Sequence, residues 1–204
     1  MEKSQIRLTE ETVGNYWKTR SKSDGMRATG YAGSTLAGQD ERYKVRKKFI
    51  FSSCPRHLKT LDYGCGIGRY AEDFKYYLGV DFTASILARA KKRCPNAKFL
   101  KLNSPFLDRK LNFKPELIFT SSVFQHNPDD LVLKIFESFV PIVKGEIMFG
   151  FYENTEAQSG HMRGRTAKDY VDMIEKYFKV YEWVSSMHRM SEEHAFTLIK
   201  ASSK

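Results

Sequence analysis

The chain has 204 residues, a formal net charge of +10 and 41% hydrophobic residues. This length suits a single globular domain, and no apolar run approaches the ~18 residues that a membrane span needs. The three cysteines, Cys54, Cys65 and Cys94, stand in separate contexts, so neither a disulfide framework nor a metal site is indicated. Because the opening residues are polar and contain no signal-peptide core, we expect a cytoplasmic protein with no membrane partner.

The positive charge is unevenly distributed along the chain. Residues 1–60 hold 13 Lys and Arg against 6 Asp and Glu, whereas residues 61–204 hold 21 against 18. A basic surface favours acidic partners such as nucleic acid or phosphorylated metabolites. A solvated basic helix around residues 38–52 is the alternative interpretation, and the sequence leaves both open.

Short apolar runs alternate with amphipathic segments after an N-terminal arm. Residues 1–35 show no clear periodicity and are predicted to form an arm with loops, followed by a charged helix over 38–52. Strands are expected at 57–63, 77–81, 97–102, 115–124, 145–152, 179–186 and 193–200. Helices are expected at 69–77, 83–94, 129–143 and 166–178. Their expected N-terminal features are Thr83 or Ser85 as caps, Asp129 and Asp130 in a first turn, and Thr166 as a cap.

This alternation predicts an α/β fold with a doubly wound, mostly parallel sheet of seven strands. The last two strands form a hairpin-like pair, which places an antiparallel strand near the C-terminus. We expect residues 1–52 to form an N-terminal helical arm or lid, and residues 53–204 to form the sheet domain.

A glycine-rich loop, "LDYGCGIGRYAEDF" at residues 61–74, follows the first strand. Glycines at 64, 66 and 68 allow a ligand to approach the backbone, and a helix starting after them would offer free N–H groups. A nucleotide-hydrolase phosphate loop is excluded because Arg69 and Tyr70 follow the last glycine. A dinucleotide pattern can be read at residues 66–71, so an oxidoreductase stays open, although such enzymes often need a second domain.

The pattern Asp62-x-Gly64-x-Gly66-x-Gly68, with Cys65 between the glycines, resembles the first motif of class I S-adenosylmethionine-dependent methyltransferases. "LGVDFTASILARAKKR" is similar to their second motif, whose acid binds the ribose hydroxyls; here it is Asp81, 17 residues after Gly64. "PELIFTSSVFQHNP" looks like the fourth motif. The resemblance implies a Rossmann-like fold and S-adenosyl-L-methionine as cofactor, held by Asp62, Gly64, Cys65, Gly66, Gly68, Asp81, Phe82, Asn103, Ser104 and Ser121.

Methyl transfer from a sulfonium is a direct displacement, so the protein mainly aligns the reactants. His126 follows the fourth strand and is a candidate general base for a hydroxyl acceptor. The alternative is a structural histidine that orients a loop. Tyr16 and Trp17 on the arm are candidates for a lid over the cofactor, or else for plain core packing. Tyr152 begins a long polar loop that is expected to form a second wall.

The acceptor class is narrowed by motifs that the sequence lacks. Neither an [DNS]-P-P-[YF] motif nor a suitably placed cysteine nucleophile follows the fourth strand. This favours transfer to an O or N atom of a small acceptor, and Arg163 and Arg165 favour an acidic one. The alternatives are a nucleic-acid methyltransferase that uses the basic arm and a non-catalytic protein that kept the fold.

Overall fold

The computed structural model describes residues 10–22, 36–107, 111–156, 162–188 and 193–204. The α-helices are α1 (Glu10–Arg20), α2 (Leu36–Ile50), α3 (Ala84–Arg93), α4 (Asp129–Phe139) and α5 (Ala167–Ile174). Two short 3-10 turns are η2 (Phe124–His126) and η3 (Val140–Ile142). The strands are β1 (Lys59–Tyr63), β2 (Tyr76–Asp81), β3 (Lys98–Lys101), β4 (Leu117–Ser121), β5 (Glu146–Asn154), β6 (Phe178–Met187) and β7 (His194–Ser203).

The strands form a seven-stranded sheet in the order β3-β2-β1-β4-β5-β7-β6. Strands β1 to β5 pair in parallel, and β7 runs antiparallel to both β5 and β6. The predicted doubly wound sheet with an antiparallel C-terminal strand is therefore confirmed. The strand order reverses between β1 and β4, and ligands bind at the carboxyl ends of the strands beside such a switch point.

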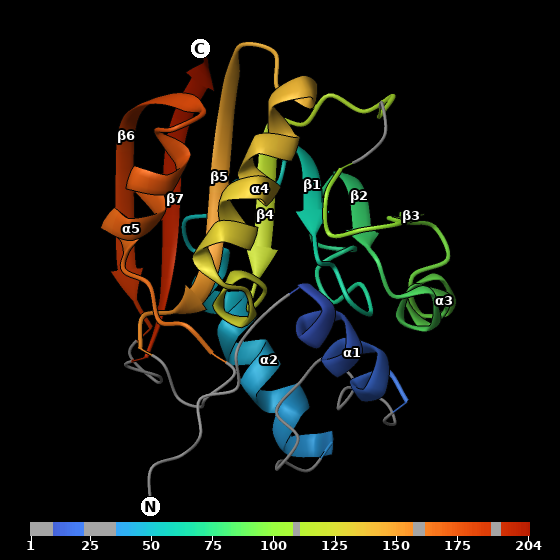
Figure 1. The fold of residues 1–204 in the computed structure, drawn as a ribbon. Coiled ribbons are helices and arrows are strands. Elements are labelled where there is room, and N and C mark those ends of the chain that lie inside the picture. The colour runs from blue at the N-terminus through green and yellow to red at the C-terminus, as the bar shows by residue number, and fades with distance from the viewer. Residues whose placement is uncertain (1–9, 23–35, 108–110, 157–161, 189–192) are drawn as a thin grey trace, which may run out of the picture.

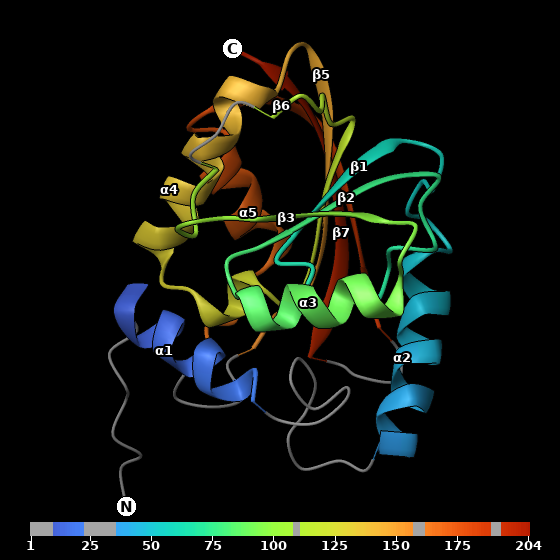
Figure 2. The ribbon, with the colours of Figure 1, turned by 90° about the vertical axis from the view of Figure 1, so that its right-hand side faces the viewer.

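Helices and loops cover both faces of the sheet (Figures 1 and 2). Helices α4 and α5 pack on one face, because apolar residues of α4 recur on one side of the helix at Leu131, Ile135 and Phe139. The other face is covered by the end of α2 and the segment after β1, whose Ile50, Tyr70 and Phe74 are buried there. The parallel strands end toward α1 and α2, which lie beyond their carboxyl ends (Figure 1).

The helix predicted at 69–77 is wrong. Residues 64–75 form turns, closed by short hydrogen bonds such as that from the Asp73 N–H to the Tyr70 carbonyl at 3.0 Å, and β2 begins at Tyr76. The chain must return in these residues along the five-residue strand β1, since Lys59 pairs with Tyr76. A helix advances ~1.5 Å per residue and a strand ~3.3 Å. A nine-residue helix is therefore too short to span the strand and leave room for its connections.

The predicted helix starts are mostly found. Thr166 caps α5 in a reciprocal capping box with Asp169, and two aspartates occupy the first turn of α4. Thr83 is at the N-cap of α3, but its side chain makes no cap hydrogen bond. Ser85 lies inside that helix, and its hydroxyl donates to Ser21 Oγ at 2.9 Å.

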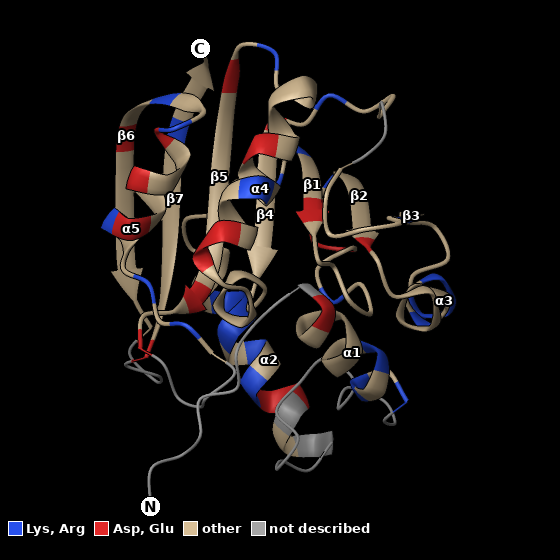
Figure 3. Cartoon of the chain, viewed as in Figure 1, with Lys and Arg blue, Asp and Glu red and all other residues tan. Residues whose placement is uncertain are grey.

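The described part of the N-terminal arm is more ordered than the sequence predicts, because it contains the 11-residue helix α1. Lys and Arg residues occur along α2 and at the end of α1, the two helices beyond the carboxyl ends of the parallel strands (Figure 3). Among the described residues, no helix is both long and apolar enough to span a bilayer.

Candidate functional site

A pocket lies at the switch point, between the ends of β1, β2 and β4 and helix α1. The loops that follow these three strands supply its walls. It is lined by Trp17, Asp62, Gly64, Cys65, Gly66, Arg69, Tyr70, Asp81, Phe82, Thr83, Ile86, Ser121, Ser122 and Val123. The structure thus brings together seven of the ten residues expected to hold a cofactor, and Trp17 from the arm.

The three glycines of the loop have left-handed backbones, with φ of 71° at Gly64, 56° at Gly66 and 69° at Gly68. A Cβ on Gly64 would lie 2.6 Å from Val123 Cγ2, so this glycine lets the β1 and β4 loops touch. A Cβ on Gly68 would lie 2.8 Å from the Phe99 ring. Gly68 lies outside the pocket lining and serves close packing rather than ligand contact.

The backbone N–H groups of the glycine loop are engaged inside the protein. Those of Gly64 and Cys65 donate to the Val80 carbonyl at 2.9 and 3.0 Å. The Gly66 N–H donates to Asp81 Oδ2 at 3.2 Å, and the Gly68 N–H donates to the Cys65 carbonyl at 3.0 Å. A loop that binds phosphate instead directs such groups at its ligand.

Asp81 is the last residue of β2, and its carboxylate connects the loop after β2 with the glycine loop. Its Oδ1 accepts the Thr83 N–H at 2.8 Å and its Oδ2 accepts the Gly66 N–H. Burial raises the pKa of Asp81, and these backbone donors act against that rise. The Thr83 hydroxyl and the Phe82 N–H also interact with this carboxylate and lower its pKa.

Asp62 ends β1 and is almost fully buried, with 2% of its surface exposed. Burial raises its pKa to about 7, although the hydroxyl of Tyr77 donates to Oδ2 at 2.7 Å and lowers it. The Cys65 thiol beside it stays protonated, because burial, Asp62 and Asp81 all raise its pKa. The pocket therefore contains two carboxyl groups at its base and no thiolate nucleophile among the described residues.

The opposite wall follows β4. Ser121 contacts the Tyr70 hydroxyl through its Oγ at 3.0 Å, and Ser122 has a left-handed backbone with φ of 59°. Arg69 supplies a cation to the same pocket. Burial, and then Arg46 nearby, lower its pKa to about 10, so it stays charged at neutral pH.

Asn103 and Ser104 line a second hollow rather than this pocket. Phe82 and Thr83 belong to both cavities, so the two adjoin along the loop after β2. The second hollow is closed on its other side by α1, and it carries Lys18, Lys22 and Lys101.

His126 lies behind the pocket wall, with 8% of its surface exposed. Its ring lies 5.1 Å from the Trp17 ring, edge to face, and 6.4 Å from that of Tyr16. The Asn154 N–H donates to Gln125 Oε1 at 3.0 Å, which turns the amide nitrogen of Gln125 toward His126 Nε2 at 3.3 Å. An amide nitrogen only donates, so Nε2 accepts and the ring proton is on Nδ1.

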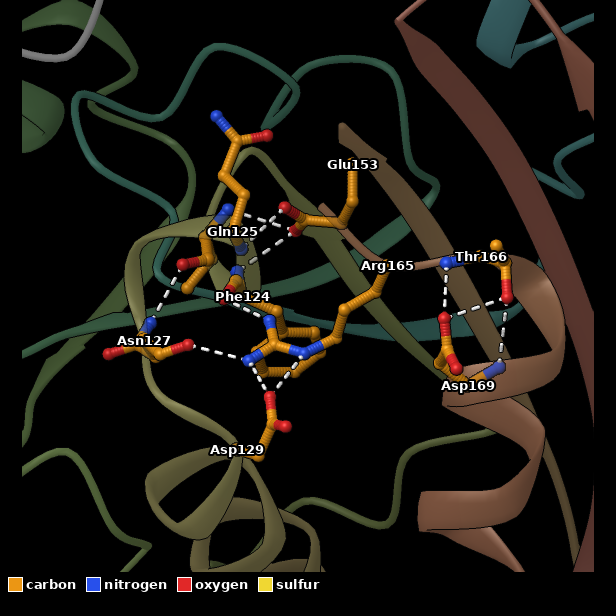
Figure 4. A network of polar contacts seen from close by, with 9 residues as sticks. Phe124, Gln125, Asn127, Asp129, Glu153, Arg165, Thr166 and Asp169 are labelled. Carbon is orange, nitrogen blue, oxygen red and sulfur yellow. Dashed lines mark hydrogen bonds and ion pairs between the residues drawn. The ribbon is translucent and has the colours of Figure 1, made fainter. Parts of the chain in front are cut away.

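The remaining expected substrate residues are not in the pocket. Tyr152 is buried between strands and α2, where Arg46 covers its ring at 4.7 Å and its hydroxyl meets His188 Nδ1 at 2.8 Å. Arg165 is buried against Asp129 in the 2.5 Å ion pair of Figure 4. Arg163 is exposed and contributes its N–H to the Gln125 carbonyl at 2.7 Å.

Sequence reasoning missed Arg69, Tyr70, Thr83, Ile86, Ser122 and Val123, all of which line the pocket. Arg69 and Tyr70 were assigned to a helix that does not form, although they directly follow the glycine motif. Among the described residues, no group of three or more His, Cys, Asp or Glu side chains is gathered for a metal ion.

Comparison with known proteins identifies the fold. No family model matches the chain, and no curated protein matches it by sequence. Among solved structures, a phosphoethanolamine N-methyltransferase from Haemonchus contortus, bound to phosphoethanolamine and S-adenosylhomocysteine, has a TM-score of 0.70 at 14% identity. The match covers 95% of this chain and 49% of that one, so this chain spans about half of its length.

Two shorter proteins match over nearly their whole length. The N-methyltransferase NodS from Bradyrhizobium japonicum, bound to S-adenosylhomocysteine, has a TM-score of 0.63 at 14% identity, covering 94% of this chain and 98% of that one. Magnesium protoporphyrin IX methyltransferase from Synechocystis, with bound SAM, has a TM-score of 0.60 at 13% identity, covering 98% and 100%. The chain has the fold of class I methyltransferases. This fold confirms the Rossmann-like architecture that the glycine motif implies.

Proposed function

We propose that the protein is an S-adenosylmethionine-dependent methyltransferase that transfers a methyl group to an O or N atom of a small acceptor. The fold supports this proposal, since the three solved structures described above are methyltransferases that share it. The pocket at the switch point, with its glycine loop and two acids, is the proposed cofactor site.

The observation that carries the proposal is the polarity of this pocket. The described N–H groups of Gly64, Cys65, Gly66 and Gly68 are bound within the protein, and no helix begins after the loop. These four N–H groups are therefore not directed at the pocket, as they would be to hold the pyrophosphate of a dinucleotide. Carboxyl groups at the base favour a ligand with cationic groups, as in S-adenosylmethionine, over one with phosphates.

Each part of the cofactor has a suitable partner in this arrangement. Asp81, which lines the pocket, suits the two ribose hydroxyls, in charge-assisted hydrogen bonds. The adjoining hollow with Asn103 and Ser104 suits the adenine ring, since it continues from Phe82. Asp62, at the end of β1, suits the cationic amino-acid tail.

The bound cofactor would supply an activated methyl group, so the chain's own task is alignment and exclusion of water. Trp17 of α1 lines the pocket and packs against His126 of the loop after β4. The Nδ1–H tautomer of His126, and its place behind the wall, do not favour a general-base role. A neutral amine acceptor needs no such base for the displacement itself.

Arg69 supports an acidic acceptor. Arg165 is engaged by Asp129 and by backbone carbonyls, whereas Arg69 lines the pocket itself. A guanidinium binds carboxylates and phosphates in a planar, bidentate manner. We therefore assign the anionic group of the acceptor to Arg69 in place of Arg163 and Arg165.

A nucleic-acid acceptor is the second candidate. It is favoured by the basic residues of α2, which face the same end of the molecule as the pocket (Figure 3).

Calorimetric titration tests the cofactor assignment. S-adenosylmethionine and S-adenosylhomocysteine should bind, while NAD and ATP should give no measurable heat. Asp81→Asn should weaken S-adenosylhomocysteine roughly 10-fold or more, because charge-assisted hydrogen bonds contribute ~1.5–3 kcal/mol each. Asp130→Asn, an exposed acid on α4, is the matched control and should bind as the parent does. Binding of NAD in place of the sulfonium cofactor would refute the proposal.

A further inference from the structure

One buried carboxylate accepts hydrogen bonds from several backbone N–H groups of the loop after β4. Glu153, on β5, accepts the backbone N–H of Val123 at 2.9 Å, of Phe124 at 3.1 Å and of Gln125 at 3.1 Å (Figure 4). The Thr120 hydroxyl donates to the same carboxylate at 3.0 Å. Burial raises the pKa of Glu153, and these donors act against the rise.

The carbonyl groups of the same loop are bound by one buried guanidinium. Arg165 donates to the Phe124 carbonyl and to the Asn127 carbonyl, both at 2.7 Å. Its remaining donors contact Asp129 Oδ1, at the start of α4. The Arg165 side chain is 3% exposed, whereas that of Asp129 is 68% exposed, so the bonds to the two carbonyls form away from water and the ion pair does not.

The two charges match the polarity of the turn η2 that lies between them. The N–H groups at the start of a helical turn carry partial positive charge, and the carbonyls at its end carry partial negative charge. Glu153 binds the N–H groups at the start of the turn, and Arg165 binds the carbonyls of Phe124 and of Asn127, so both charges stabilise this one turn. A single 3-10 turn has little stability of its own.

The turn held in this way contacts the arm. Its last residue, His126, packs against Trp17 of α1 with ring centroids 5.1 Å apart. Ser121, Ser122 and Val123, at its other end, form the pocket wall that faces Trp17. We propose that Glu153 and Arg165 are positioning residues. They fix the loop 122–127 in the position in which α1 packs against it and closes the pocket.

The effect on ligand binding follows from this geometry and rests on the proposed function. A displaced loop would move the wall formed by Ser121, Ser122 and Val123, although neither charged residue touches the pocket. The docking of Trp17 does not depend on which ligand the pocket takes, so it can be measured separately.

The chain offers a direct reporter, because it contains two tryptophans. In a Trp183→Phe background, which removes a residue 44% exposed on β6, Trp17 is the remaining fluorophore. Acrylamide quenching would be measured for the parent, for Glu153→Gln and for Arg165→Lys. Glutamine turns an NH2 group toward backbone donors, and lysine keeps the charge without the planar fork. Both variants should raise the Trp17 quenching constant at least about 2-fold.

Thr166→Ala is the matched control. It removes the cap of α5 next to Arg165 in the chain, and Figure 4 shows its contacts with Asp169 apart from those of the loop. It should lower stability without changing the quenching of Trp17. Far-UV circular dichroism would establish that each variant is folded; if Glu153→Gln does not fold, Arg165→Lys decides.

Unchanged quenching in a folded Arg165→Lys or Glu153→Gln protein would overturn the proposal. An equal rise in Thr166→Ala would overturn it as well, since the effect would then be general loosening. In a second measurement, S-adenosylhomocysteine should bind the two loop variants 3- to 10-fold more weakly than it binds the control. Absence of binding to the parent itself would refute the proposed function. The quenching result alone would then decide whether Glu153 and Arg165 fix the loop against which α1 packs.

Discussion

Asp62 and Asp81 end neighbouring strands, yet their surroundings differ. Asp81 accepts two backbone N–H groups and lies at the pocket surface, while Asp62 is buried with one phenol donor, Tyr77. An ionised carboxylate is disfavoured where it loses water and gains few donors. Ionisation of Asp62 therefore opposes folding, and burial raises its pKa to about 7.

Replacing Asp62 should change the pH dependence of stability. The unfolded carboxyl ionises near its ordinary value of 3.8, while the folded one ionises at about 7. Stability contributed by this group is therefore greatest below pH 4 and is lost as pH rises to 7. Asp62→Asn keeps an acceptor for Tyr77 and removes this loss. Its free energy of unfolding should exceed the parent's above pH 7 by at most about 4 kcal/mol.

Urea unfolding at pH 4.5, 6 and 8 measures this difference. The two proteins should converge toward pH 4.5. A variant that is less stable by the same amount at each pH would show that the pKa of Asp62 does not differ between the folded and unfolded protein.

The sequence predicts strand-end residues well and long-range partners poorly. Asp62, Asp81 and the glycines could be found because their positions follow directly from a strand and a turn. The role of Arg165 depends on Asp129, 36 residues away, and on carbonyls of a turn that no local pattern indicates. An arginine that binds a ligand and one that holds a loop have the same local sequence signal.

At the scale of elements, the connection between β1 and β2 departs most from expectation. A helix is expected at 69–77, but in the structure Tyr70 and Phe74 pack as turn residues against Phe119. No helix forms here because the short connection must run back along the five-residue strand β1. The other expected helices form because their connections are longer or their caps are present.

Gly68, in the connection between β1 and β2, and Gly145, just before β5, allow the cost of backbone strain to be measured apart from the cost of crowding. Gly68 and Gly145 both have left-handed backbones, with φ of 69° and 85°. A Cβ at Gly68 would meet the Phe99 ring at 2.8 Å, whereas one at Gly145 would meet no described atom within 4 Å. Gly145→Ala should cost about 1 kcal/mol of unfolding free energy from strain, and Gly68→Ala about 2–4 kcal/mol. Urea denaturation measures both, and equal losses would contradict the packing role of Gly68.

At the scale of the whole molecule, the basic residues of α2 lie apart from the acids of the pocket. The acids of the pocket lie at strand ends, while the basic residues of α2 lie outside them (Figure 3). This arrangement suits attraction of a small anion toward the end of the molecule as readily as contact with a nucleic-acid backbone.

Salt dependence distinguishes these two uses. If α2 and the arm only attract small anions, nucleic acid should bind weakly, at ~10⁻⁴–10⁻⁶ M in physiological salt, without sequence preference. Fluorescence anisotropy with labelled RNA and DNA duplexes measures this, and heparin chromatography of an Arg42→Gln, Lys44→Gln variant provides the control for simple charge. Micromolar or tighter sequence-selective binding, with methyl label on the nucleic acid, would favour the rival acceptor.

The internally bonded glycine loop has a consequence for amide hydrogen exchange. The N–H groups of Gly64, Cys65, Gly66 and Gly68 are donated to protein acceptors before any ligand arrives. Exchange of the Gly64 and Cys65 amides with deuterium then requires the loop to separate from β2, because both donate to the Val80 carbonyl. The protection factors of these two amides should equal those of the central strands in the ligand-free protein and should change little when S-adenosylhomocysteine is added. The Gly68 amide, which donates within the loop to the Cys65 carbonyl, should exchange faster.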